Sequence, residues 1–478
     1  MQPINRRDFL GIAAAATAAT ALTTVGCNNS DNTISTRGGS ASASSEIPTD
    51  KMTMRRNPKT GDQVSVLGYG MMRLPTTSKT SARESDDEID QETVNELCDY
   101  AIAHGLNLFD TSPAYCKGRS EHAMGIALSR HKRSEYFVST KLSNFGSQTW
   151  SREASIAMYR NSMKELQVDY IDYLLLHGIG MTAWDGNGKE LTGMESFENR
   201  YINNGVLDFL MAEREAGRIK NLGFSYHGDI KVFDYLLSQH DKHHWDFALI
   251  QMNYVDWKWA NQVNPRNTNA EYLYAELWEK RQIPVFVMEP LLGGRLARLP
   301  QHPTEMLKAK RPESSIASWS FRWIASHPGV LSILSGMTYM EHLQDNLRSL
   351  CPLDPLTDDD FTFMQHVADE FVKFPLVPCT GCQYCMPCPY GIDIPTAFSH
   401  YNRCVNEGNI AVSRMDANFF EARQRFLIGY DRLVERKRQA AHCIGCGQCK
   451  PHCPQNIDIP ARLNDINDYM EKLKQWTL

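Results

Sequence analysis

The 478-residue chain lacks an excess of positive charge. It contains 50 Lys and Arg residues against 56 Asp and Glu residues, which gives a formal net charge of -6. A chain of this charge has no overall attraction to a phosphate backbone. The short basic run from Arg436 to Arg438 is typical of a solvated helix face. The composition therefore predicts no nucleic-acid partner.

The N-terminal segment has too little apolar sequence to span a membrane comfortably. Its Ala/Thr-rich run covers residues 11–26 and is short and weakly apolar. The run follows the sequence Asn5-Arg6-Arg7-Asp8-Phe9-Leu10, which resembles a twin-arginine export signal. We therefore expect residues 1–27 to be such a signal and the protein to be exported, to the periplasm or to a membrane-anchored state.

The end of this signal offers a site for a lipid anchor. Residues 24–27 read Thr-Val-Gly-Cys and resemble a lipoprotein processing box in which Cys27 is lipidated. Residues 28–50 are rich in Ser, Thr, Gly and Asn, which is typical of a flexible linker. The alternative is simple cleavage near residue 27 without a lipid. A lipid anchor would hold the mature protein at the membrane.

Cysteine is concentrated near the other end of the chain. Eight of the 13 cysteines fall in two similar motifs, CTGCQYCMPCPYGIDIP from Cys379 and CIGCGQCKPHCPQNIDIP from Cys443. A disulfide framework suits short secreted scaffolds, and zinc sites usually take their cysteines in separated pairs. Three cysteines at two-residue gaps followed by Cys-Pro are typical of iron–sulfur ligation. The repeat predicts two [4Fe–4S] clusters.

The ligands of each cluster come from both motifs if the chain follows two-cluster ferredoxins, in which the fourth cysteine of each motif ligates the other cluster. One predicted set is Cys379, Cys382, Cys385 and Cys453; the other is Cys388, Cys443, Cys446 and Cys449. The first motif departs from the bacterial pattern, with two residues and not three before its last cysteine. The stretch between the motifs has helical periodicity, so we expect residues 376–478 to form a mainly helical ferredoxin-like domain.

Residues 51–375 alternate short β-rich runs with amphipathic helical stretches. Eight strands are expected, at residues 64–68, 106–110, 136–140, 170–176, 219–224, 247–251, 284–288 and 331–334. Strict alternation of eight strands with helices predicts an α/β fold, a (β/α)8 TIM barrel, with its active site at the carboxyl ends of the strands.

Polar side chains follow three successive strands of this predicted barrel. Asp110 and Tyr115 follow the second strand, Lys141 ends the third and His177 ends the fourth. With Glu121 after Tyr115, this order resembles the aldo-keto reductase family over most of residues 60–350. The resemblance implies an oxidoreductase that interconverts a carbonyl and an alcohol of a small-molecule substrate.

The resemblance also implies a role for each of the four residues. Tyr115 would protonate the carbonyl oxygen as hydride reaches the carbon, and would act as the base in reverse. A free phenol has a pKa of about 10, which the charge of Lys141 would lower. Asp110 would hold that ammonium, and His177 would orient the carbonyl.

Residues for a nicotinamide cofactor are implied less completely. The matching positions are Ser225, Gln251, Gly293, Arg295, Ser335, Gly336, Gln344 and Asn346. Tyr226 stands where the family commonly has asparagine, Met288 where it commonly has a stacking aromatic, and the arginines for a 2′-phosphate are missing. We therefore expect NAD(P) without a preference for NADP, and flavin is a second candidate.

The clusters and the barrel raise a question of electron supply. A cluster passes one electron and a nicotinamide passes two, and no soluble nicotinamide pool is expected outside the cytoplasm. Three interpretations remain: clusters that conduct electrons to or from a partner protein or quinone, clusters that are structural, and a barrel with another redox cofactor. The main alternative function is an electron-transfer or binding module in which the barrel is not catalytic.

Overall fold

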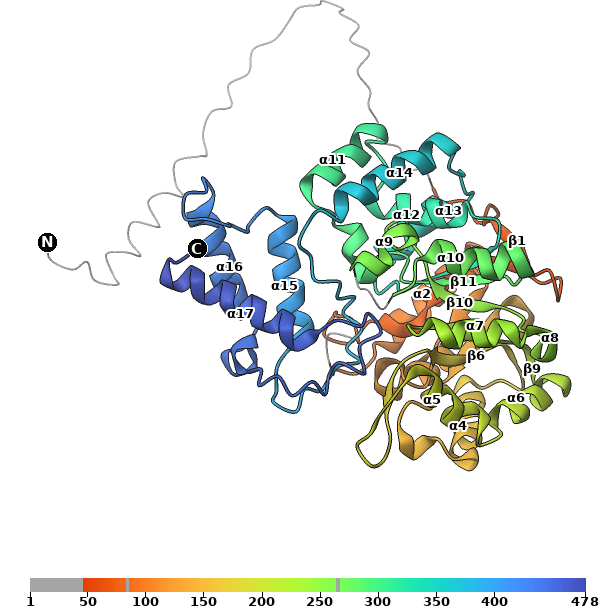
Figure 1. The fold of residues 1–478 in the computed structure, drawn as a ribbon. Helices are drawn as coiled ribbons and strands as arrows, with labels where there is room; N and C mark the ends of the chain where they lie inside the picture. The colour runs from red at the N-terminus through yellow and green to blue at the C-terminus, as the bar shows by residue number, and fades with distance from the viewer. Residues whose placement is uncertain (1–45, 83–85, 264–266) are drawn as a thin grey trace, which may run out of the picture. The chain divides into compact units, whose positions relative to one another are not determined.

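The structure is a computed structural model that describes residues 46–82, 86–263 and 267–478 (Figure 1). Its contacts divide the chain into two units, Met1–Glu46 and Ile47–Leu478. The expected export signal, Cys27 and most of the expected linker lie outside the described residues. In the ranges that are described, no helix has both the length and the apolar character needed to cross a membrane.

Eight parallel strands close into a barrel, which confirms the predicted fold. Each strand pairs with the next, and the last pairs with the first. In order around the barrel they are β3 (Leu67–Gly70), β4 (Leu108–Asp110), β5 (Phe137–Leu142), β6 (Ile171–Ile179), β9 (Ile219–Tyr226), β10 (Ala248–Gln251), β11 (Val285–Met288) and β12 (Val330–Ser335).

The expected position of the first barrel strand, residues 64–68, was wrong by three residues at its start. Val64 belongs to β2 (Gln63–Ser65), which pairs antiparallel with β1 (Met54–Arg56). The barrel strand β3 begins at Leu67. Val64 and Val66 are both fully buried, so apolar alternation continues across the break and could not reveal it.

Helices surround the barrel strands, as Figure 1 shows. The buried residues of α2 are Val94, Leu97, Cys98 and Ala101, which follow the spacing of an amphipathic helix. Ser151 begins α4 by accepting a hydrogen bond from the Ala154 N–H. The helices are α2 (Gln91–Ala103), α3 (Ser120–Leu128), α4 (Arg152–Leu166), α6 (Val206–Glu215), α7 (Ile230–Ser238), α8 (His240–His243), α9 (Asp256–Val263), α10 (Ala270–Tyr274), α11 (Gln301–Lys310), α12 (Ile316–Ala325), α13 (Met340–Leu350) and α14 (Asp358–Phe371).

The long connection after β6 is anchored on the carboxyl end of the barrel. It contains β7 (Ala183–Trp184), β8 (Glu190–Leu191), α5 (Gly193–Phe197) and a π-helical turn, Glu198–Ile202. Arg200 in that turn is buried and donates to the carbonyl oxygens of His177 and Asn144. The connection therefore lies at the barrel mouth.

The cysteine motifs each lead directly into a helix. In both motifs the sequence Ile-Asp-Ile-Pro begins the helix, with Asp393 and Asp458 as N-caps and proline in the first turn. The helices that follow are α15 (Ile394–Asn406) and α17 (Ile459–Gln475), with α16 (Phe419–Leu433) between them in the chain. These three helices, blue in Figure 1, share a hydrophobic core separate from that of the barrel.

Candidate functional site

A buried ion pair lies at the carboxyl ends of β4 and β5. The Lys141 Nζ atom donates to Asp110 Oδ1 at 2.6 Å and to the Thr111 carbonyl oxygen at 2.7 Å. Ser139 Oγ donates to the second carboxylate oxygen at 2.8 Å. Burial raises the pKa of Asp110, and the neighbouring ammonium acts in the opposite direction. Hydrogen bonds on both carboxylate oxygens fix the position of the lysine charge.

The other two predicted residues lie beside this charge. The Lys141 Nζ atom is 4.7 Å from the centroid of the Tyr115 ring. The rings of Tyr115 and His177 are 5.9 Å apart, edge to face at 82°. Tyr115 is 8% exposed and His177 is 2% exposed. The structure thus brings Asp110, Tyr115, Lys141 and His177 together in one nearly enclosed site.

His177 is positioned by two serines, Ser112 and Ser143, which the sequence did not single out. Its Nδ1 atom lies 2.6 Å from Ser143 Oγ and 3.4 Å from Ser112 Oγ. Burial, reinforced by the charge of Lys141, holds the pKa of His177 well below its ordinary value. The imidazole is therefore neutral at pH 7 and acts through hydrogen bonds. Ser112 lies two residues after Asp110, and Ser143 lies two residues after Lys141. In a strand, residues two apart point to the same face, so this spacing could have indicated that both serines face the site.

Glu121 adds a buried carboxyl behind the site. It lies in the first turn of α3 and accepts a hydrogen bond from Thr140 Oγ1 at 2.6 Å. Burial raises the pKa of Glu121 to about 7, against the opposing effects of Thr140 and of the Lys141 charge. A second acid close to the Lys141 strand therefore titrates near neutral pH.

The first predicted cysteine set surrounds one cavity, which we name the inner cysteine site. Cys379, Cys382, Cys385 and Cys453 all line it, with apolar side chains that include Phe398 and Ile457. Backbone N–H groups of Gly381 and Ile457 donate to Cys379 Sγ at 3.4 Å and Cys453 Sγ at 3.5 Å. Cysteines of both motifs therefore meet here.

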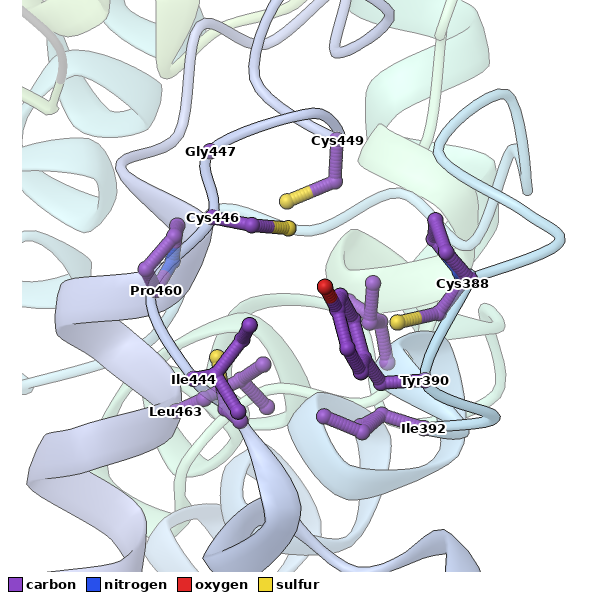
Figure 2. A pocket seen from close by; sticks show the side chains of 12 residues that line it. Cys388, Tyr390, Ile392, Ile444, Cys446, Gly447, Cys449, Pro460 and Leu463 are labelled. Atoms are coloured by element: carbon purple, nitrogen blue, oxygen red, sulfur yellow. The ribbon is translucent and has the colours of Figure 1, made fainter.

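The second predicted set surrounds another cavity, which we name the outer cysteine site. Its cysteines are Cys388, Cys443, Cys446 and Cys449. Figure 2 shows Cys388, Cys446 and Cys449 on different sides of this cavity, with the Tyr390 ring among them. The structure therefore groups the eight cysteine side chains in the crossed arrangement expected from ferredoxins.

The chemistry of both cavities fits an iron–sulfur cube. Each offers four thiols in a mainly apolar lining. Burial raises the pKa of both Cys379 and Cys453 to about 12 and that of Cys449 to about 11. Ligation of iron would require each thiol to lose its proton. Within the described ranges, no three His, Cys, Asp or Glu side chains are grouped to hold a single metal ion.

Several residues expected to hold a nicotinamide contact other parts of the chain. Ser225 Oγ accepts from the Gly178 N–H at 2.8 Å. The Gln251 amide donates to Asp256 Oδ2 at 2.7 Å, and its oxygen accepts from Gln455 at 2.8 Å. Both side chains are therefore engaged within the protein.

The remaining expected residues also contact other parts of the protein. A Cβ atom on Gly293 would lie 2.2 Å from the Thr380 carbonyl oxygen. Arg295 packs over the Phe371 ring at 5.4 Å and interacts electrostatically with Cys379. Asn346 Nδ2 donates to Ser335 Oγ at 2.9 Å. A Cβ atom on Gly336 would touch the Arg73 side chain, and Gln344 is half-buried on α13. This arrangement does not fit a dinucleotide lying along these residues.

Comparison with known protein families assigns three parts of the sequence. Residues 66–369 match the Aldo/keto reductase family, residues 378–457 match a 4Fe-4S dicluster domain, and residues 3–23 match the twin-arginine translocation signal sequence. The aldo/keto reductase match covers most of the barrel. The dicluster match contains all eight cysteines of the two sites.

Individual relatives resemble the barrel part of the chain. The chain is 23% identical to the uncharacterized oxidoreductase YqkF of Bacillus subtilis over 339 residues, 65% of this chain and 95% of that protein. It is 26% identical to an NADH-specific methylglyoxal reductase of Escherichia coli over 305 residues, 56% of this chain and 85% of that protein.

A solved aldo-keto reductase structure shows the same fold. A thermostable aldo-keto reductase solved with the inhibitor epalrestat is 19% identical, with a TM-score of 0.50, over 66% of this chain and 100% of that one. An aldo-keto reductase from Bacillus halodurans is 20% identical, with a TM-score of 0.49, over 66% of this chain and 96% of that one.

Proposed function

Because the chain belongs to the aldo/keto reductase family, we propose that its barrel interconverts a carbonyl and an alcohol with Tyr115 as general acid and base. The observation that carries this proposal is the position of Lys141, 2.6 Å from Asp110 and 4.7 Å from the Tyr115 ring centroid. A fixed positive charge beside a phenol stabilises the phenolate. Tyr115 then gives its proton to the substrate oxygen and takes it back in the reverse direction.

His177 completes this site as a neutral hydrogen-bond group. With the Ser143 hydroxyl 2.6 Å from Nδ1, the other ring nitrogen is free to donate to a carbonyl oxygen. A neutral imidazole directs the oxygen toward Tyr115 without competing for its proton. The low exposure of both rings excludes bulk water from the reacting oxygen.

The dicluster domain is proposed to exchange electrons for this chemistry. The inner and outer cysteine sites would each hold one [4Fe–4S] cluster, which carries one electron. Reduction of a carbonyl takes up two electrons and two protons. Tyr115 would supply the proton on oxygen, and the hydrogen on carbon would come as hydride from a two-electron carrier, a flavin or a nicotinamide, that two one-electron transfers from the clusters would reduce again. A redox protein or a quinone outside the chain is the expected partner.

Nicotinamide is the alternative electron carrier, because the matched Escherichia coli relative is named as NADH-specific. Flavin is a second alternative. Extraction of small molecules from the anaerobically purified protein, followed by mass spectrometry, identifies a bound dinucleotide or flavin directly.

The match to a twin-arginine translocation signal at residues 3–23 supports export of the protein. We propose a periplasmic protein that is anchored through a lipid on Cys27. Mass spectrometry of the mature N-terminus checks the lipid, and extraction of membranes with detergent should release the protein. Full-length protein in the cytoplasmic fraction would contradict the export proposal.

The catalytic proposal is tested by Tyr115→Phe in the anaerobically purified full-length protein. Small aldehydes and dicarbonyls are assayed with reduced viologen and, separately, with NADH and NADPH. Loss of the general acid should lower kcat/KM by about 10²- to 10⁴-fold while iron and sulfide content stays unchanged. Tyr272→Phe is the matched control, because Tyr272 is 43% exposed on α10. Unchanged reduction in Tyr115→Phe would contradict the proposal.

A further inference from the structure

The cysteine segment of the first motif lies against loops at the carboxyl ends of the barrel strands. Arg73, just after β3, donates from Nη2 to the Thr380 carbonyl oxygen at 2.7 Å. Gly293, after β11, approaches the same peptide so closely that a Cβ atom would lie 2.2 Å from its oxygen. One peptide between Cys379 and Gly381 is therefore held by two separate barrel loops.

The second motif contacts the barrel as well. Gln251, the last residue of β10, exchanges two amide hydrogen bonds with Gln455, at 2.8 Å and 3.3 Å. Asn456 Nδ2 donates to Asn267 Oδ1 at 3.0 Å. The side chains that follow Cys453 thus hold the inner cysteine site to the barrel from a second side.

Two aromatic rings connect the inner cysteine site with the catalytic histidine. Tyr384 lies in the loop between Cys382 and Cys385, and its ring is 6.1 Å from that of Phe145. The Phe145 ring is in turn 4.8 Å from His177. Phe145 follows β5, the strand that carries Lys141. The inner cysteine site is therefore the redox site next to the proposed reaction centre.

A cation lies on the barrel loop that packs against this site. Arg295 is two residues after Gly293, whose backbone is packed against Thr380, the neighbour of Cys379, and its guanidinium carbon lies 5.4 Å from the centroid of the Phe371 ring. Among the described residues, the Arg295 Nε atom has no hydrogen-bond partner. Four thiolates around an iron–sulfur cube carry net negative charge, and a nearby cation favours the more negative, reduced form. Arg295 is thus placed to act on a cluster.

We infer that the C-terminal cysteine segment occupies the part of the barrel mouth expected to bind a nicotinamide dinucleotide, with Arg295 as the positioning cation of the inner cysteine site. This inference rests on the proposed function of the barrel and names the group that adjoins its catalytic residues. It accounts for Gln251 and Gly293, whose expected cofactor roles are replaced by contacts with Gln455 and Thr380.

The first test is dinucleotide binding to the anaerobic, cluster-loaded, full-length protein. NADH and NADPH are titrated separately and followed by equilibrium dialysis and by nicotinamide fluorescence. We expect no saturable binding of either one, and no dinucleotide in the extract of the purified protein. One equivalent bound in solution or recovered in the extract would overturn the inference.

The second test measures the clusters and requires no substrate. In a potentiometric titration followed by electron paramagnetic resonance, Arg295→Gln should lower the midpoint potential of one cluster and leave the other unchanged. A tenfold change in the one-electron equilibrium corresponds to about 59 mV. The matched control is Arg298→Gln, an exposed arginine three residues further along. Unchanged potentials of both clusters in Arg295→Gln would overturn the role of Arg295.

Arg295→Lys guards against a folding defect. This variant keeps the positive charge, so its clusters should have the midpoint potentials of the unmodified protein even if Arg295→Gln fails to load its clusters. A lowered midpoint potential in Arg295→Lys would contradict the charge argument. Neither measurement depends on Tyr115. An inactive Tyr115→Phe protein with saturable dinucleotide binding would keep the proposed function and remove this inference. An active Tyr115→Phe protein without dinucleotide binding would contradict the proposed function and keep this inference.

Discussion

The inner and outer cysteine sites are built from near-copies of one sequence, yet their surroundings differ. Both motifs place a glycine of positive φ between their first two cysteines, Gly381 at 65° and Gly445 at 73°. Cys453 of the inner site is 9% exposed, whereas Ile444 and Tyr390 at the outer site are 63% and 48% exposed. The repeat sets the ligand geometry, and the neighbouring structure decides what each site can reach.

The difference suggests a division of labour. The inner cysteine site contacts the barrel through Thr380 and Gln455, and Tyr384 connects it to Phe145. The outer cysteine site presents exposed apolar side chains, those of Ile444 and Tyr390. In this scheme electrons are exchanged with the partner at the outer site and used beside the inner one.

Removal of one ligand from each site gives the largest expected effect. Cys453→Ser and Cys446→Ser should each lower iron content from about eight to about four atoms per chain. Because the ligands cross between motifs, Cys453→Ser should leave the same resonance spectrum as Cys382→Ser, and Cys446→Ser should leave a different one. Cys453→Ser should also abolish carbonyl reduction. If Cys453→Ser and Cys446→Ser left identical spectra, the crossed assignment would be wrong.

The contact between the inner site and the barrel is tested by a pair of adjacent glycines. Gly293 and Gly294 both have positive φ, at 67° and 97°, but only Gly293 is tightly packed against another peptide. Gly293→Ala adds a clash to the backbone strain and should cost about 3 to 5 kcal/mol, against about 1 to 2 kcal/mol for Gly294→Ala. Thermal unfolding measures both. The inner cluster's spectrum should change in Gly293→Ala alone, and equal effects would argue against the docking contact.

The barrel side of the comparison has a pH signature at Glu121. Its pKa is about 7 in the folded protein against an ordinary value of 4.5. The raised pKa means that its contribution to stability is fully present below about pH 4.5 and is lost as pH rises through 7. Glu121→Gln, which keeps the shape without the charge, should remove a pH dependence on the order of 2 to 3 kcal/mol. Unfolding at pH 5, 6, 7 and 8 checks this, and an unchanged slope would contradict it.

The smallest structural effect is expected at the outer site. Ile444→Asp should change stability by no more than about 0.5 kcal/mol, because the side chain is largely exposed. Electron uptake from a carrier protein should nevertheless slow, as measured by stopped-flow reduction of the clusters. Val412→Asp is the control, since Val412 is 81% exposed and does not line either cysteine cavity. Equal slowing in both variants would show no preference for the outer site.

Local patterns were sufficient for the barrel and for the grouping of residues at its mouth. Strand ends meet at one face of a closed barrel, so Asp110, Lys141 and His177 could be placed together from their positions after successive strands. Long-range contacts could not be predicted in this way. Nothing in the sequence near Gln251 or Gly293 indicates that each faces a residue far along the chain.

Two tryptophans illustrate the same limit. From the local sequence alone, Trp257 and Trp259 could be exposed aromatics in a loop that stack on a ligand. In the structure they lie on α9, and Trp257 packs 5.3 Å from Trp323 while Trp259 donates to Asp369 at 2.9 Å. Their environment is set by α12 and α14, whose approach the local sequence does not encode.

The crossing of the two motifs has a consequence for biogenesis. The inner cavity needs Cys453 as well as Cys379, and the outer cavity needs Cys388 as well as Cys443. Neither pocket can therefore form before the second motif, residues 443–453, has been synthesised. Insertion of the clusters would have to follow that point, and export through the signal near the opposite terminus would have to wait for it. A translocation route that accepts finished, folded cargo meets this order of events.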